Sequence, residues 1–164
     1  MYLALVTSSA WVLLAYRLPR EPSTPRIALW RRLRALGVAQ LGDGLVALPA
    51  DSRTREQLEW LAGEVEEAGG EASVWLAEPA SARQARALAE QMRLAVAAEY
   101  LELAEAARAA LKADSGSLKR RLAKLRRDGR RIRRRDYFPP PEREHALQAL
   151  RALGEVVELE EAAS

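Results

Sequence analysis

Residues 11–25 read WVLLAYRLPREPSTP, and this stretch decides how the chain begins to fold. Its first six residues form an unbroken apolar run, which is typical of a strand covered on both faces. Pro19 cannot donate a hydrogen bond to a sheet and therefore ends the strand. Thr24 has the side chain of a helix cap, and Pro25 has the preset φ that a first helical turn accepts. The stretch predicts a buried strand, a turn and the start of a helix.

The helix that follows is predicted to be amphipathic and to end at Gly37. Its core stripe is expected at Ile27, Trp30, Leu33 and Leu36. Trp60, on a later helix, is also expected in the core, because large aromatic side chains favour burial. Trp75 alternates out of phase with its neighbours on the last strand, so it is expected on the open face of the sheet.

A hairpin is predicted directly after the first helix. Apolar runs at residues 38–41 and 45–48 are separated by Gly42-Asp43-Gly44. Glycine adopts the positive φ angles that a tight turn needs, so the two runs are expected to pair antiparallel.

A second helix and a last strand complete the N-terminal part. Asp51 or Ser52 is placed to cap this helix, which ends at Gly69-Gly70, and residues 72–76 have the pattern of a strand. The order strand, helix, strand, strand, helix, strand is that of the split βαβ arrangement. We therefore expect an α+β fold with a ferredoxin-like βαββαβ domain over residues 1–79.

Residues 80–164 are expected to form an α-helical C-terminal extension. Residues 80–113 are rich in Ala, Glu, Leu and Arg without a breaker, which favours one long helix. Ser117 is placed to cap a basic helix over residues 117–135, and a final helix is expected at 142–160. The basic helix has a narrow apolar stripe at Leu118, Leu122, Leu125 and Ile132.

Positive charge is concentrated in this basic helix. The whole chain has a net charge of +3, but residues 119–135 hold eleven Lys or Arg and one acid, so they carry +10 and the rest carries −7. Clustered cations release counterions from nucleic acid and favour DNA as a partner. The candidate phosphate contacts are Lys119, Arg120, Lys124, Arg127, Arg130, Arg131 and Arg134. The alternative is a solvated helix whose cations pair with acids of the flanking helices.

Several motifs together resemble the N-terminal domain of the ChrB chromate-resistance family. They are WVLLAYRLPREPSTPR at residues 11–26, ALWR at 28–31, GLVALP at 44–49, LEWL at 58–61, EAGGE at 67–71, and the DYF segment at 136–138. The resemblance implies a chromate-responsive regulator of transcription, and typical members continue into a second domain.

The same βαββαβ core is similar to the central domain of the phenylacetate repressor PaaX and to the small CRISPR adaptation nucleases. These relatives are dimers, which implies a homodimer here. In the nucleases an aspartate after the first strand holds a metal, whereas this chain has Arg17, which cannot ligate one. A degenerate metal-dependent nuclease is therefore only a third reading.

The proline-rich turn is a second candidate site, for chromate or another oxyanion. A helix N-terminus with nearby arginines attracts anions. The candidate residues are Arg17, Arg20, Thr24 and Arg26. In the alternative, Arg17 and Arg20 pair with Glu21 or with acids across the sheet.

The composition excludes several chemistries. There is no cysteine, which rules out a disulfide, a thiolate metal site and a cysteine nucleophile. His145 is the single histidine and is expected on the surface of the last helix. We expect no catalytic residues, no metal, no cofactor and no enzyme activity.

The first 16 residues carry no charged side chain, but they are too short to span a membrane and lack the basic start of a secretory signal. A cytoplasmic protein that does not bind membranes is expected. The leading hypothesis is transcriptional regulation through DNA, and the alternative is a dimerisation or interaction module of the chromate response that does not bind DNA.

Overall fold

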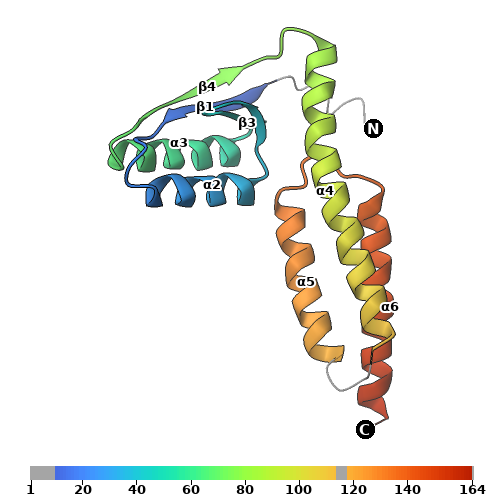
Figure 1. Ribbon diagram of the computed structural model, residues 1–164. Coiled ribbons are helices and arrows are strands. Elements are labelled where there is room, and N and C mark those ends of the chain that lie inside the picture. The colour runs from blue at the N-terminus through green and yellow to red at the C-terminus, as the bar shows by residue number, and fades with distance from the viewer. Residues whose placement is uncertain (1–9, 114–117, 164) are drawn as a thin grey trace. The chain divides into compact units, whose positions relative to one another are not determined.

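The chain forms two compact units in a computed structural model that describes residues 10–113 and 118–163 (Figure 1). The first unit runs to Met92 and contains a sheet, and the second begins at Arg93 and is helical. The sheet ends at Ala77, and helix α4 (Ala82–Leu111) contributes its first turns to the first unit. Of the described helices, none combines the length and the apolar character that a membrane span requires.

Four antiparallel strands form the sheet of the first unit. Strands β1 (Trp11–Arg17), β2 (Ala39–Gly42), β3 (Leu45–Pro49) and β4 (Glu71–Ala77) lie in the order β2-β3-β1-β4. Helices α2 (Thr24–Leu36) and α3 (Ser52–Glu67) cover one face of this sheet (Figure 1). The arrangement confirms the predicted α+β fold with a βαββαβ domain followed by a helical C-terminal part.

The core of the first unit lies between the sheet and its two helices. Val12 and Leu14 of the central strand β1 have no exposed surface. Leu14 lies opposite Val46 on one side and Val74 on the other, so these side chains share the face that α3 covers. The predicted strand is confirmed and has neighbours on both sides, but α2 and α3 cover only one of its faces, and Leu13 and Ala15 on the other face are half-buried.

Gly44 holds the hairpin against the central strand. It has a φ of 70°, as predicted for the turn, and its carbonyl oxygen accepts a 2.8 Å hydrogen bond from the Tyr16 backbone N–H. A Cβ atom at this position would lie 2.3 Å from the Tyr16 carbonyl oxygen. Only glycine therefore fits here, on grounds of both backbone angle and space.

Helix α3 begins with a reciprocal capping box, which confirms Asp51 as the cap residue. The Asp51 Oδ1 accepts a 2.7 Å hydrogen bond from the Thr54 N–H, and the Thr54 Oγ1 accepts one of 3.0 Å from the Asp51 N–H. Thr54 is fully buried, and its hydroxyl donates to the Pro49 carbonyl at 2.6 Å. The cap thus ties the helix to the end of β3.

The predicted burial of two tryptophans is wrong. Trp30 is 55% exposed beneath the Arg34 guanidinium, and Trp60 is 70% exposed with its Nε1 donating to Glu64. Helix α2 buries Leu29 and Leu33 instead. For Trp30 the reason is geometric: steps of three residues fall about 60° short of a full turn, so a stripe built from three such steps turns away from the core.

Helix α2 begins at Thr24, and the residue in the cap position is Ser23, one residue before the expected Thr24. The Ser23 side chain makes no capping hydrogen bond. Trp75, by contrast, is 60% exposed and lies opposite Leu13, on the sheet face away from α2 and α3, as predicted.

The second unit consists of the remainder of α4 with α5 (Leu118–Arg134) and α6 (Glu142–Ala162), which lie side by side (Figure 1). The predicted apolar stripe of α5 is buried between its neighbours. The predicted cap Ser117 lies outside the described residues. The core residues of this unit are Val96, Tyr100, Leu103, Ala104, Ala107 and Ala110 of α4, the α5 stripe, and Ala146, Ala149, Leu150, Leu153 and Val157 of α6.

Candidate nucleic-acid interface

The outward face of α5 presents a continuous stripe of cations. Successive members are separated by four, three, four and three residues, a spacing that keeps them on one side of a helix, opposite the buried stripe. All of them are exposed, and the stripe is about 21 Å long at 1.5 Å per residue. We call these five residues the cationic stripe: Arg120, Lys124, Arg127, Arg131 and Arg134.

Two of the seven sequence-predicted contacts have carboxylate partners. The Lys119 Nζ lies 2.6 Å from the Glu161 Oε1 of α6, and this contact raises the pKa of Lys119. The Arg131 Nη1 lies 3.7 Å from the Oδ1 of Asp128, which is one turn earlier on the same helix. The other five, Arg120, Lys124, Arg127, Arg130 and Arg134, form no ion pair with any residue in 10–113 or 118–163. Intramolecular neutralisation therefore accounts for a minority of the charge.

Arg135, just beyond the end of α5, has a different role. Its Nε donates to the Glu99 Oε1 at 3.0 Å, and its Nη2 donates to the second carboxylate oxygen. The Arg135 side chain is only 19% exposed. These two hydrogen bonds to Glu99 of α4 fix the end of the basic helix, and they pair the charge of Arg135 with a carboxylate.

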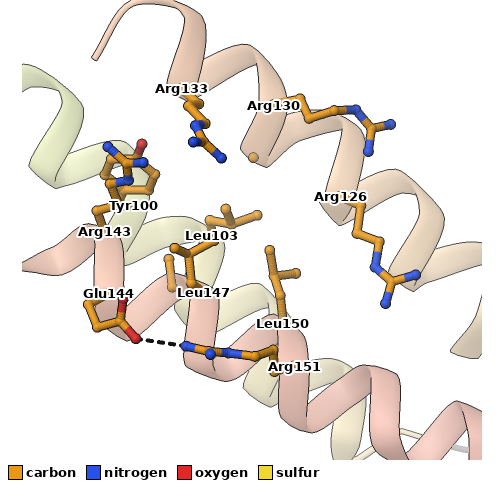
Figure 2. Close-up of a pocket in the computed structure, with 12 residues that line it drawn as sticks. Tyr100, Leu103, Arg126, Arg130, Arg133, Arg143, Glu144, Leu147, Leu150 and Arg151 are labelled. Carbon is orange, nitrogen blue, oxygen red and sulfur yellow. Dashed lines mark hydrogen bonds and ion pairs between the residues drawn. The ribbon is translucent and has the colours of Figure 1, made fainter. Parts of the chain in front are cut away.

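A groove of about 490 Å³ separates α5 from α6, and of the residues that line it sequence reasoning singled out Arg130 alone, as a phosphate contact. Arg126, Arg130 and Arg133 line it from α5, and Arg143 and Arg151 from α6 (Figure 2). A seven-residue interval joins Arg126 to Arg133, which is a signal for one shared flank of a helix. Their meeting with arginines of α6 depends on how the helices pack, and no local pattern encodes it.

A buried carboxyl contacts Tyr100 and Arg143, two of the residues that line this groove. The side chain of Asp136 is fully buried, and its Oδ2 accepts a 2.9 Å hydrogen bond from the Tyr100 hydroxyl, with the Arg143 Nη1 at 3.5 Å. Within the described residues its Oδ1 has no hydrogen-bond partner. Burial raises the pKa of Asp136, against the opposing effects of the Tyr100 hydrogen bond and of the Arg143 and Arg133 charges.

The pKa of Tyr100 is raised, as is that of Asp136. Burial, and then the hydrogen bond to Asp136, raise the pKa of the Tyr100 hydroxyl well above its ordinary value. The hydroxyl therefore remains protonated and donates its hydrogen bond throughout the physiological pH range.

The second sequence-predicted site, at the proline-rich turn, is not gathered into one cluster. Arg17 pairs with Glu71 on the neighbouring strand, with its Nη2 2.7 Å from the Glu71 Oε2. Arg20, Thr24 and Arg26 are exposed in the turn and the first turn of α2. Arg26 lies near enough to Tyr16 to lower the pKa of that hydroxyl, which burial raises by a larger amount.

His145 is exposed on α6, as predicted. The described part of the chain holds no group of three or more His, Cys, Asp or Glu side chains placed to bind a metal ion.

Comparison with known proteins gives two matches. The family model described as "Protein ChrB, N-terminal" matches residues 26–114. Protein ChrB of Cupriavidus metallidurans is 35% identical over 138 residues, a match that covers 80% of this chain and 41% of that protein. The chain thus spans less than half the length of this relative. No solved structure matches the chain.

Proposed function

The chain belongs to the ChrB N-terminal family, and from this membership we propose that it acts in chromate resistance as a regulatory or accessory protein that binds DNA through helix α5. The observation that carries the DNA-binding part is the cationic stripe. Its charge lies on an exposed helix face, while the opposite face of α5 is already used for packing. In this proposal the protein acts by binding and not by catalysis.

The physical basis of the proposed binding is electrostatic. Each phosphate that a cation neutralises releases condensed counterions, so log K falls with log[salt] at a slope of about −0.9 per phosphate. If each member of the cationic stripe contacts one phosphate, the expected slope is about −4.5. Binding of this kind needs no base-specific contact, so the proposal does not include sequence preference.

An electrophoretic mobility-shift assay across a range of salt concentrations tests the proposal. It uses DNA from the operon that encodes this protein and a random duplex of equal length. We expect retardation at low salt that weakens steeply as salt rises. Replacing Lys124, Arg127, Arg131 and Arg134, four members of the cationic stripe, with Gln should reduce the magnitude of the slope by up to about 3.6. Absence of binding even at low salt would rule the proposal out.

A matched control separates local charge from total charge. Replacing Arg31, Arg53, Arg83 and Arg86 with Gln removes the same number of cations from exposed positions of the first unit. This variant should retain the slope of the unmodified chain. An equal decrease in the salt slope in the two variants would mean that net charge, and not helix α5, determines binding.

A second candidate function is a dimerisation module, and the exposed strand β4 favours it. This strand lies at one edge of the sheet that the described residues form, and its Trp75 and Leu76 are both exposed. Exposed apolar side chains on an edge strand are a common site of pairing between chains. A tight homodimer without affinity for DNA would favour this function over the first.

Sedimentation equilibrium tests the dimer. We expect Trp75→Lys to shift the chain toward monomer, because a charge would be buried in the interface. Trp60→Lys is the control, since Trp60 is also exposed but lies on α3. A dimer that survives Trp75→Lys, or a monomeric unmodified chain, contradicts the module.

A further inference from the structure

The groove between α5 and α6 combines cationic walls with little compensating acid. Figure 2 shows Arg126 and Arg133 reaching from α5 toward the space between the helices, while Arg130 points away from it. Of the described residues that line the groove, Glu144 alone is acidic, and its Oε1 accepts a 2.7 Å hydrogen bond from Arg151. Neither Arg126 nor Arg133 forms an ion pair within residues 10–113 and 118–163. The groove therefore has a net positive charge.

The two ends of the groove hold their arginines differently. At one end the Arg143 Nη1 lies 3.5 Å from the Oδ2 of the buried Asp136 carboxyl. At the other end the Arg126 Nη2 lies 3.0 Å from the position that a Cβ atom would occupy at Gly154. Arg126 therefore crosses from α5 to the backbone of α6.

The floor of the groove is apolar. Leu103 of α4 and Leu147 and Leu150 of α6 line it, and Leu147 is 37% exposed. Gly129 of α5 carries no side chain, and a Cβ atom there would lie 3.3 Å from Leu103 and 3.6 Å from Leu150. The helix thus approaches the floor closely without adding a polar side chain to it.

We infer that this groove binds a small organic anion, one with a carboxylate, phosphate or sulfonate head and an apolar body. The head would be held by Arg133 and Arg143, because guanidinium groups form strong hydrogen bonds with such oxygens. The body would cover the leucine floor. A volume of about 490 Å³ is within the range of small-molecule sites and is larger than an inorganic oxyanion needs.

Arg133 and Arg143, which would hold the head of the anion, do not belong to the cationic stripe, so the groove and the proposed DNA contact use different residues. The cationic stripe faces outward and has no apolar component, which suits a phosphate backbone. The groove has an apolar floor, which a phosphate backbone would leave unused. Each proposal is therefore able to fail without the other.

The test uses the full chain and naphthyl phosphate, whose fluorescence anisotropy reports binding directly. Inorganic phosphate offers only the charged head and naphthol only the apolar body, and both are measured as competitors. We expect naphthyl phosphate to bind at least about tenfold more tightly than either competitor. It alone of the three contacts both the arginines of the walls and the leucines of the floor.

Two variants assign the binding to the groove. Arg133→Gln should weaken naphthyl phosphate about tenfold, as the loss of one charge-assisted contact. Leu147→Gln should weaken it several-fold by making the floor polar. The controls are Arg108→Gln and Leu159→Gln, which remove an exposed cation and an exposed leucine of the same helical unit away from the groove.

Weakening by Arg133→Gln and Leu147→Gln, with unchanged binding in the controls and an unchanged circular dichroism spectrum, supports the inference. Equal affinity for inorganic phosphate overturns it in favour of a simple oxyanion site, and equal affinity for naphthol overturns it in favour of an apolar surface. Lack of binding by the unmodified chain also overturns it.

Discussion

At the scale of single residues, the contact between Tyr100 and Asp136 joins the helices of the second unit. Tyr100 belongs to α4, and Asp136 lies in the segment between α5 and α6. Both pKa values are raised, because burial favours the neutral form of each group. The stability of this unit is therefore linked to pH through a hydroxyl that holds its proton more tightly in the folded chain than in the unfolded chain.

Tyr100→Phe removes both the hydrogen bond to Asp136 and the titrating hydroxyl, and the two losses have different pH dependences. Near neutral pH the variant should lose about 1.5–3 kcal/mol, which is the contribution of a hydrogen bond to a charged group. Above about pH 10 the unfolded chain releases the Tyr100 proton while the folded chain retains it, so the unmodified chain loses stability as pH rises. The difference between the two proteins should then shrink.

Denaturant unfolding at about pH 8 and about pH 11 measures this change. The unmodified chain provides the reference at each pH, so that titration of other tyrosines affects both proteins equally. A difference in unfolding free energy that stays constant between the two conditions would contradict the assigned link.

At the scale of elements, the start of α3 depends on a few hydrogen bonds of known geometry. Asp51 and Thr54 satisfy each other's backbone N–H groups, and Thr54 also joins the helix to Pro49. Such signals are local in sequence, which explains why a cap at Asp51 or Ser52 and helix ends at Gly37 and at Gly69-Gly70 could be predicted.

Asp51→Ala should destabilise the first unit by about 1 kcal/mol, because a backbone N–H at the helix start loses its acceptor. Asp51→Asn should retain most of the stability, since an asparagine side chain also accepts that hydrogen bond. Chemical unfolding followed by tryptophan fluorescence compares the three proteins. Equal stability of the alanine variant and the unmodified chain would show that the cap contributes nothing.

Prediction from sequence was less successful where a helix has apolar residues on more than one face. All the strands were located to within about two residues, and the buried stripe of α5 was identified correctly, because its leucines alternate between steps of three and four. For α2 the predicted stripe correctly included Leu33, but it also included the exposed Ile27 and Trp30 and missed the buried Leu29. The sheet and α3 decide which of them is covered, and that information is not local.

At the scale of the whole molecule, the two units have separate cores. Val12 and Leu14 belong to one, and Leu103 and Leu153 belong to the other. The cationic stripe could be predicted because its residues lie on a single helix. The groove could not be predicted, because its arginines come from α5 and α6 and meet only after these helices have packed on α4.

Separate cores lead to a prediction for unfolding. All four tryptophans lie in the first unit, so tryptophan fluorescence reports on that unit alone. Leu153→Ala, at a fully buried position of α6, should cost about 2–5 kcal/mol in the second unit. The transition seen by far-ultraviolet circular dichroism should move, while the fluorescence transition remains in place. A joint shift of both transitions would mean that the units unfold together.

The contact of Arg126 with the backbone at Gly154 makes the shape of the groove depend on a residue that carries no charge. A methyl group at residue 154 would lie 3.0 Å from the Arg126 Nη2, so the flexible guanidinium would have to shift by a few tenths of an ångström. Gly154→Ala would therefore alter one end of the groove while the net charge of the chain stays the same.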